Sequence, residues 1–495
     1  MKKYILAIDQ GTTSTRAILF DHHKNIMGIS QKEGHLFYPY PGWVELDANE
    51  IWTCTLAVIA DVLQKTHIDP SEIEAIGITN QRETTVLWDK NTGLPIYHGI
   101  VWQSKQTIFQ CQEAIKKGYE ETIKKKTGLR IDPYFSASKI AWLLENVPGA
   151  REKAEHNELL FGTIDTWLVW KLSGQTCHIT DVSNASRTLL CNIHTLEWDD
   201  ELLEMFDIPR SILPEIRSTC EVYTKTSPEV FFNQQIPIAS VIGDQQAALF
   251  GQGCRQAGLV KNTYGTGGFM LMNTGETIVE SKYGLLSTVA WKIGDQVQYA
   301  LEGSIFVSGS LMKYLRDQWN FFEKASQSQA MATSVKDTGG VYFVPAFVGL
   351  GAPYWDQDAK ASVVGLTFGT TKEHIVRAAL ESMAYQSKDV LDAMIKDSGV
   401  SISSLKVDGG AAQNDFLLQF QSDLLQCQVE RFAINELTAL GAAFMAGLAT
   451  GYWTMEDCHV DLESVFTPEN GEDIMRQKYE QWTKAVHACM AFHQE

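Results

Sequence analysis

The chain has 495 residues, of which 44% are hydrophobic and 20% charged, proportions that exclude a disordered or fibrous protein. Its 41 Lys and Arg against 60 Asp and Glu give a formal net charge of −19, which argues against binding to nucleic acid or to anionic lipid. A single hydrophobic core stops growing near ~250–300 residues, so this length predicts two or more large domains.

The cysteines and the longest apolar stretches bear on the cellular compartment of the protein. The nine cysteines include no Cys-x-x-Cys pair and are expected to be free thiols in a reducing compartment. The apolar run at residues 4–8 is too short for a secretory signal and ends at Asp9. Residues 439–449, the longest apolar stretch, fall well short of the ~18 residues that a membrane span needs. We therefore expect a soluble, cytoplasmic protein with no membrane insertion.

The N-terminal region opens with a predicted hairpin. Residues 4–8 and 15–20 have the apolar pattern of strands, and the turn between them, residues 10–13, is Gln-Gly-Thr-Thr. A further apolar strand at residues 75–78 runs into the polar cluster 79–84.

The same hairpin pattern returns near the middle of the chain. A predicted strand at residues 236–242 ends at Gly-Asp-Gln-Gln, residues 243–246, and a helix of small residues follows. Predicted strands at residues 259–264 and 269–272 then flank the turn Gly-Thr-Gly-Gly, residues 265–268. Two hairpins with Gly-Thr tips, about half the chain apart, indicate a duplicated architecture.

The second half alternates strands with helices. A capping box at residues 370–373 predicts the start of a long helix with apolar residues at a 3.6-residue period. A strand at residues 405–407 leads into Asp-Gly-Gly-Ala, residues 408–411, and a helix from about residue 414 to 425. This alternation predicts the α/β class. We expect two domains, residues 1–252 and 253–495.

Several familiar signatures are absent from the sequence. There is no GxxxxGK[ST] loop, no GxGxxG motif after a strand and no HExxH, GxSxG or zinc-type Cys/His spacing. P-loop NTPases, Rossmann dehydrogenases and zinc hydrolases are therefore disfavoured.

Three strand-to-glycine turns remain as candidate sites. In the turn at residues 9–16, backbone N–H groups and hydroxyls can cradle an anion, and Asp9 suits hydrated Mg²⁺, although a plain polar turn fits equally well. Asp244 stands where a general base, a metal-binding carboxylate or a simple N-cap residue could stand. Gly409 and Gly410 leave room for a ring or a phosphate before a helix, or form an ordinary turn.

All three turns together, spread over both halves, are the arrangement of the actin-like ATPases. The chain resembles the carbohydrate kinase family within that superfamily, and among its members those that phosphorylate glycerol. The resemblance covers essentially the whole chain and is carried by residues 9–14, 41–45, 77–84, 131–136, 161–167, 243–251, 262–267, 344–356 and 407–410. It implies two actin-like (ribonuclease H-like) α/β domains with the active site in the cleft between them.

The resemblance also implies an activity and its participants. The implied activity is the Mg²⁺-dependent transfer of the γ-phosphate of ATP to a terminal hydroxyl of glycerol, with release of ADP. The implied enzyme is a homodimer or a homotetramer. Residues implied to bind the acceptor are Thr12, Arg82, Glu83, Trp102, Tyr134, Asp244, Gln245 and Phe269. Those implied to bind the nucleotide are Thr12, Thr13, Ser14, Arg16, Thr266, Gly309, Lys313, Gly410 and Asn414. Asp9 and Asp244 would bind Mg²⁺, while Asp244 as general base and Arg16 beside the moving phosphoryl group would be catalytic.

The sequence departs from the family pattern in places. Lys313 stands where relatives commonly have Gln, and the loop at residues 103–106 lacks the usual Arg-Arg. Residues 223–235 contain no His and no glycine-rich basic stretch, so control by His phosphorylation or fructose bisphosphate is not expected. Two alternatives stay open: another sugar kinase of the same family, and an actin-like chaperone or filament protein.

Overall fold

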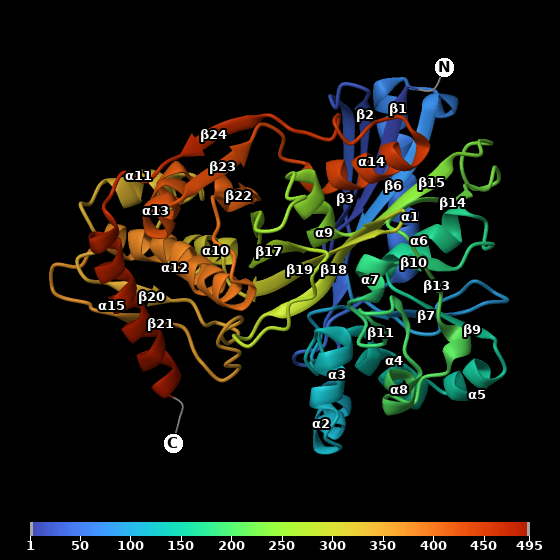
Figure 1. Ribbon diagram of the computed structural model, residues 1–495, viewed down its shortest axis with the longest axis horizontal. Coiled ribbons are helices and arrows are strands. Elements are labelled where there is room, and N and C mark those ends of the chain that lie inside the picture. Colours follow the sequence, from blue (N-terminus) through green and yellow to red (C-terminus); the bar gives the residue numbers. More distant parts are fainter. Residues whose placement is uncertain (1–2, 493–495) are drawn as a thin grey trace.

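One large sheet runs through both halves of the molecule (Figure 1). The structure is a computed structural model and describes residues 3–492. The 13 strands of the sheet follow the order β24-β23-β22-β16-β17-β19-β18-β14-β15-β6-β1-β2-β3. Strands from the first half of the chain form one end of this sheet, and strands from the second half form the other.

The first half contributes six strands. β1 pairs antiparallel with β2, and β2 with β3, whereas β1, β6 and β15 are parallel. Residues 5–10 of β1 are all buried, as expected for a strand with neighbours on both edges and helices over its faces. The bounds are β1 Tyr4–Gln10, β2 Ser14–Asp21, β3 Ile26–Glu33, β6 Ile73–Asn80, β14 Cys220–Lys225 and β15 Pro237–Gly243.

The second half repeats this pattern. β16 pairs antiparallel with β17, and β17 with β19, whereas β16, β22 and β23 are parallel. The duplication predicted from the two hairpins is therefore confirmed strand by strand. The bounds are β16 Val260–Tyr264, β17 Gly268–Gly275, β18 Leu286–Ile293, β19 Gln296–Ile305, β22 Ser404–Asp408, β23 Gln428–Phe432 and β24 Leu462–Phe466.

The two halves of the sheet join at β14 and β18, where a single residue pair, Cys220 and Ile293, is in register. Smaller sheets lie outside the main one. Their strands are β4 Leu36–Phe37, β5 Glu45–Leu46, β8 Gly99–Ile100, β7 Val86–Asp89, β9 Leu159–Gly162, β10 Ile179–Asp181, β13 Glu215–Arg217, β11 Cys191–Asn192, β12 Glu197–Trp198, β20 Tyr342–Val344 and β21 Ser362–Val364.

Helices cover both faces of the sheet. In the first half these are α1 Ala48–Thr66, α2 Ile108–Lys116, α3 Glu120–Thr127, α4 Ser136–Asn146, α5 Ala150–Glu155, α6 Ile164–Leu172, α7 Val182–Ala185, α8 Asp200–Met205 and α9 Asp244–Gly251. In the second half they are α10 Gly309–Asp317, α11 Gln327–Thr333, α12 Lys372–Ser398, α13 Asp415–Leu425, α14 Leu437–Thr450 and α15 Glu472–Ala491. Short 3₁₀ segments are η1 Pro70–Glu72, η2 Arg210–Ile212 and η3 Gly410–Gln413.

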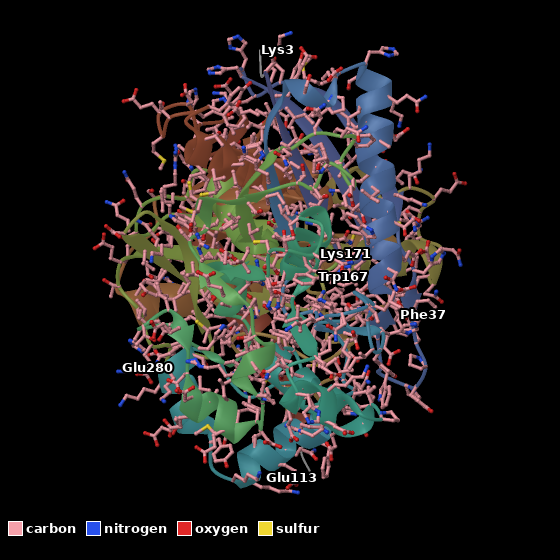
Figure 2. All side chains as sticks on the ribbon, turned by 90° about the vertical axis from the view of Figure 1, so that its right-hand side faces the viewer. Lys3, Phe37, Glu113, Trp167, Lys171 and Glu280 are labelled. Atoms are coloured by element: carbon pink, nitrogen blue, oxygen red, sulfur yellow. The ribbon has the colours of Figure 1, made fainter. Side chains whose placement is uncertain are left out.

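Helix α6 shows how the first half is packed. Trp167 donates a 2.8 Å hydrogen bond to the carbonyl of Ala48 at the start of α1, and the Lys171 ammonium lies over the rings of Trp52 and Trp167. Figure 2 shows Trp167 and Lys171 beside the long helix α1. Across residues 3–492, no helix is both long and apolar enough to cross a membrane.

Helix α14 crosses from one half to the other. Although it follows β23 in sequence, it packs on β6, β15 and β1, and its red ribbon lies among the blue strands in Figure 1. It also packs on α9, where the contact is so close that a Cβ added at Gly441 would lie 2.0 Å from the carbonyl oxygen of Ala247. A glycine is therefore required at this crossing.

Two local predictions need correction. Asp244 was expected in the turn before a helix, but it is the first residue of α9 and Gly243 is the N-cap residue. The capping box was placed at residues 370–373, whereas Thr371 is the N-cap and His374 completes the box. In both cases the helix is shifted by one to three residues, because neighbouring residues can cap equally well and the tertiary contacts decide between them.

Candidate functional site

The loop after β6 carries two charged residues into the interior. Arg82 and Glu83 are 3% and 1% exposed, and Glu83 has a left-handed backbone with φ of 61°. Ser136 at the start of α4 donates a 2.9 Å hydrogen bond to the Glu83 carbonyl, which holds this conformation in place. A charged residue in a strained, buried loop is uncommon in a purely structural position.

Arg82 is the centre of the predicted acceptor site. Its Nη2 donates to the hydroxyl of Tyr134 at 3.4 Å, and its Nε lies 3.4 Å from the carboxylate of Asp244. Its two Nη atoms form a bidentate pair with Glu302 at 2.5 and 3.0 Å. The structure thus brings Arg82, Glu83, Tyr134 and Asp244 to one place, as the sequence predicted.

Two members of this cluster were not anticipated. Arg187 donates to Glu83 at 2.7 Å and to Glu302 at 2.9 Å, and neither Arg187 nor Glu302 has exposed surface. Burial alone would raise the pKa of Glu302, but Arg187 and Arg82 outweigh it and lower that pKa to about 2. Burial raises the pKa of Glu83, against the opposing effect of both arginines. The only sequence signal for Glu302 was a single charged residue within an otherwise uncharged strand.

Aromatic side chains form one wall of the same place. The ring of Trp102 meets Tyr134 edge-on at 5.5 Å and Phe269 at 6.1 Å between centroids. The indole N–H of Trp102 donates to the hydroxyl of Thr12 at 2.9 Å, which connects this wall to the turn after β1. The predicted aromatic contacts and the predicted phosphate turn are therefore adjacent.

A buried lysine holds the Tyr134 loop. Lys139 has no exposed surface, and its ammonium donates to the carbonyls of Pro133, Tyr134 and Phe135, the last two at 2.7 and 3.0 Å. Burial lowers its pKa to about 8, although Glu83 acts in the opposite direction. This residue was also missed, because a lysine in a predicted amphipathic helix is usually on the solvent face.

Asp244 and Gln245 open helix α9. Ser183 of α7 accepts a 2.9 Å hydrogen bond from the N–H of Gly243, which fixes the end of β15, and the N–H of Gln245 donates to Asp244 at 2.7 Å. Burial raises the pKa of Asp244, while Arg82 and then Lys261 lower it. A carboxylate at this position, with a raised proton affinity, is chemically suited to accept a proton.

The turn between β1 and β2 carries the other predicted phosphate contacts. Thr12, Thr13 and Ser14 lie at its tip, where the N–H of Gly11 donates to the carbonyl of Ser14 at 2.9 Å. Arg16 lies 3.7 Å from Asp9 and 3.3 Å from Glu436 at the start of α14.

Asp9 is a buried carboxylate whose negative charge is only partly neutralised by its neighbours. Burial, opposed by Arg16 and reinforced by Asp244 and Glu436, raises the pKa of Asp9 to about 7 from 3.8. Within residues 3–492 no cluster of three His, Cys, Asp or Glu has the spacing of a metal site. Mg²⁺ normally uses only one or two protein carboxylates besides phosphate oxygens and water, so the pair Asp9 and Asp244 fits that ion.

The second half offers a matching turn. The carbonyl of Thr266 accepts from both the N–H and the hydroxyl of Ser310, and the N–H of Gly309 donates to Gly265 at 2.9 Å. A Cβ at Gly309 would lie 2.6 Å from the Gly265 oxygen, so only glycine fits at the start of α10. Thr266 itself is exposed at the tip.

The remaining residues that were predicted to bind the nucleotide lie on separate elements of the second half. Gly409, with φ of 91°, packs against the backbone of Tyr264, and Gly410 beside it faces open space. Asn414 caps α13 and donates to Ser328 at 3.3 Å, which gives it a structural contact of its own. Lys313 is exposed on α10.

Two actin-like α/β domains with acid-bearing and glycine-bearing turns at the ends of their strands are the architecture of the sugar and polyol kinases. Residues 4–251 match the N-terminal domain, and residues 260–450 the C-terminal domain, of the FGGY family of carbohydrate kinases. The chain belongs to this family.

Individual relatives and solved structures are similar to the chain over nearly its whole length. The chain is 60% identical over 495 residues to "Glycerol kinase" of Geobacillus sp. (strain WCH70) and 59% identical to that of Thermus thermophilus, covering 99% of this chain and 100% of each relative. It resembles the structure of Plasmodium falciparum glycerol kinase with ADP, with a TM-score of 0.92, 38% identity and 98% coverage of both chains. A xylulose kinase from Lactobacillus acidophilus, 22% identical with a TM-score of 0.89 over 98% of both chains, shares the fold.

Proposed function

We propose that the protein acts as a glycerol kinase, transferring the γ-phosphoryl group of ATP to a terminal hydroxyl of glycerol and giving sn-glycerol 3-phosphate and ADP for glycerol catabolism. One observation carries the proposal: buried Arg82 reaches Tyr134 and Asp244 beside the aromatic wall of Trp102 and Phe269. The identity of about 60% to full-length relatives named glycerol kinase supports it.

The acceptor is held mainly by polar contacts. A three-carbon polyol offers little apolar area, so its affinity comes from hydrogen bonds to charged groups in a water-poor site. Arg82 supplies donors, Glu83 and Asp244 supply acceptors, and the rings of Trp102 and Phe269 pack on the carbon chain. Such a site discriminates against analogues that lack a hydroxyl, because its own polar groups would be left unpaired.

Phosphoryl transfer depends on positioning and on neutralisation of charge. The nucleotide phosphates lie between the turn of Thr12, Thr13 and Ser14 and the turn of Thr266. Asp244 accepts the proton of the attacking hydroxyl, and Arg16 with the turn N–H groups takes up charge on the moving group. Asp9 and Asp244 would hold Mg²⁺, which would supply neutralisation of the phosphate charge.

A coupled ADP-release assay across four acceptors tests the proposal. Glycerol should give the highest kcat/KM, ahead of dihydroxyacetone, erythritol and xylulose. A preference for xylulose would assign the protein to another activity of the same family. ADP release that no acceptor stimulates would favour an actin-like chaperone or filament protein.

Replacing the proposed base tests the mechanism. Asp244→Asn should lower kcat by at least ~10²-fold, since general-base catalysis contributes ~10²–10⁴-fold. The matched control is Asp473→Asn, because Asp473 also lies in the first turn of a helix, α15, but its side chain is 80% exposed. Near-normal turnover of a folded Asp244→Asn protein would remove Asp244 from this role.

We further propose a cytoplasmic enzyme that forms a dimer or tetramer. The nine cysteines are all free, as suits a reducing compartment that supplies ATP. Phe368 is fully exposed and Leu366 beside it is 57% exposed, and apolar surface of this kind is often covered in an assembly. Light scattering after size exclusion should give a multiple of the chain mass; the mass of one chain would contradict the oligomer.

A further inference from the structure

Lys261 is a fully buried lysine that the proposed mechanism leaves unused. It lies on β16 of the second half and has no exposed surface. Its ammonium donates to Oε1 of Gln245 and, at 2.9 Å, to the hydroxyl of Thr263. Because Gln245 belongs to α9 of the first half, this contact joins the two halves directly at the acceptor site.

The surroundings of Lys261 keep it charged. Burial lowers its pKa to about 8; Asp408 and Asp244 favour the ammonium form, Arg82 opposes it and Glu302 favours it. A charge is costly to bury unless opposite charges and hydrogen-bond partners surround it. Lys261 has both, so it stands as an ammonium donor beside α9.

An ammonium group can only donate hydrogen bonds, which determines the orientation of Gln245. The carboxamide oxygen must face Lys261, and the amide nitrogen Nε2 must therefore face the other way. Gln245 is 9% exposed, and among residues 3–492 no group accepts a hydrogen bond from Nε2, which is not one of the fully buried atoms without a partner and so keeps some contact with solvent. Since this nitrogen is open to solvent and its partner oxygen is held by Lys261, Nε2 is free to donate a hydrogen bond to a ligand oxygen.

We propose that Lys261 is a positioning residue that sets the hydrogen-bond polarity of the acceptor site: it turns the Gln245 carboxamide so that the site presents a donor to one oxygen of the polyol. This rests on the proposed function, in which Gln245 binds the acceptor. The site then offers donors from Arg82 and Gln245 and acceptors from Glu83 and Asp244. It selects a hydroxyl or carbonyl oxygen facing Gln245 and disfavours an ammonium group there.

Substitution of Lys261 tests the proposal. Lys261→Met keeps the length of the side chain but removes its charge and its donors. It should raise the KM for glycerol, and the glycerol Kd from calorimetry, about tenfold, while the KM for ATP changes less than about twofold. Lys261→Arg, which still donates and stays charged, should recover most of this loss.

The matched control is Lys406→Met. Lys406 is paired in register with Lys261 on the neighbouring strand β22, but it donates to the carbonyl of Gln252, away from the acceptor site. It should leave both KM values unchanged. An unchanged glycerol KM in folded Lys261→Met, or an equal rise in both KM values, would overturn the proposal.

A second variant keeps the question answerable if Lys261→Met does not fold. Gln245→Glu has the same shape and retains a partner for Lys261, but its carboxylate cannot donate. Its KM for glycerol should rise at least tenfold, whereas an unchanged or lower KM would show that Gln245 presents an acceptor.

Wild-type protein is assayed first: if it phosphorylates xylulose and not glycerol, the proposed function fails and the same variants are compared on xylulose. A wild type that uses no acceptor overturns both.

Discussion

Four charged side chains are buried together beneath the proposed acceptor site, two arginines and two glutamates. Glu302 contacts Arg82 at 2.5 and 3.0 Å and Arg187 at 2.9 Å, while Arg187 also contacts Glu83 at 2.7 Å. The charges balance, so each removal leaves an excess charge among buried residues. The energetic consequence of a substitution is therefore set by the partner that remains.

Glu302→Gln should be strongly destabilising. Breaking a buried pair by removing one partner costs about 3–5 kcal/mol, which should appear as a lower urea midpoint. The same variant should weaken glycerol binding in calorimetry, because Arg82 loses the partner that orients it. Glu113→Gln is the control, since Glu113 pairs with Lys116 on the surface at 2.8 Å and such pairs contribute ~1 kcal/mol or less. Equal urea midpoints for the two variants would contradict this account.

His178 should make stability depend on pH. Its Nε2 donates to the carbonyl of Phe161, 2.8 Å away, and the ring lies edge-on to Trp88 and Trp170. Burial lowers the pKa of His178 to about 4 from 6.5. The unfolded chain therefore takes up a proton at His178 as the pH falls below 6.5, whereas the folded protein takes it up only near pH 4. Stability is unaffected above pH 6.5 and falls as the pH drops from 6.5 to 4, by about 1–3 kcal/mol.

The measurement is the difference in urea midpoint between pH 7.5 and pH 5. His178→Gln should reduce this difference, because it removes the group that takes up the proton. His23→Gln changes an exposed histidine and should leave the difference as in the wild type. If both variants keep the full difference, carboxylates rather than His178 cause the pH dependence.

At this scale the predicted acceptor residues were easier to find than the residues that hold them in place. Arg82, Glu83, Tyr134 and Asp244, which the family resemblance assigned to the acceptor site, do meet in space. Glu302 and Lys261 were missed because their partners are distant in sequence. Each is a single charge inside a buried strand pattern, and that mismatch was the available signal.

At the scale of elements, the crossing of α9 and α14 positions the helix turn that carries the proposed base, Asp244. Cβ atoms at Gly251 and Gly441 would lie 2.2 and 2.0 Å from backbone oxygens of the opposite helix. The helices therefore touch backbone to backbone, and α9 carries Asp244 in its first turn. Any change in their separation is transmitted to the proposed base.

Gly441→Ala should affect both stability and catalysis. The added methyl group meets backbone atoms of Ala247, which cannot rotate away, and overpacking of this kind costs about 1–3 kcal/mol. Displacement of α9 by a fraction of an ångström should also lower kcat, by up to ~10²-fold. Gly471→Ala, where no atom lies within 4 Å, is the control. A stable Gly441→Ala protein with normal kcat would show that the crossing is more tolerant than its geometry indicates.

The elements themselves were largely predictable. The strand–turn–strand units at residues 4–20 and 259–272 have apolar runs separated by Gly-Thr turns, which are local signals, and the structure confirms both. The exchange of α14 onto the strands of the first half was not predicted. Its Ala- and Gly-rich pattern indicated close packing, but nothing local specifies which half supplies the partner.

For the whole molecule, the narrow connection of the main sheet between the halves bears on the reaction. The main sheet is joined across β14 and β18 by one registered residue pair, and the other cross-contacts include the α9–α14 crossing and the Arg16–Glu436 pair. Transfer to an alcohol rather than to water requires a site from which water is excluded. We propose that residues 1–252 and 253–495 rotate about this connection to close on both substrates, with α9 and α14 near the pivot.

Small-angle scattering tests closure. Glycerol together with a non-hydrolysable ATP analogue and Mg²⁺ should reduce the radius of gyration, whereas glycerol alone should reduce it less, because the phosphates contact turns from both halves. Arg16→Met is the informative variant, since it removes a cation that contacts Glu436 of the second half at 3.3 Å and lies beside the proposed phosphate turn. It should close less fully at saturating ligand and release ADP more often without phosphorylating glycerol. An unchanged radius in the wild type would mean that water is excluded without movement of the halves.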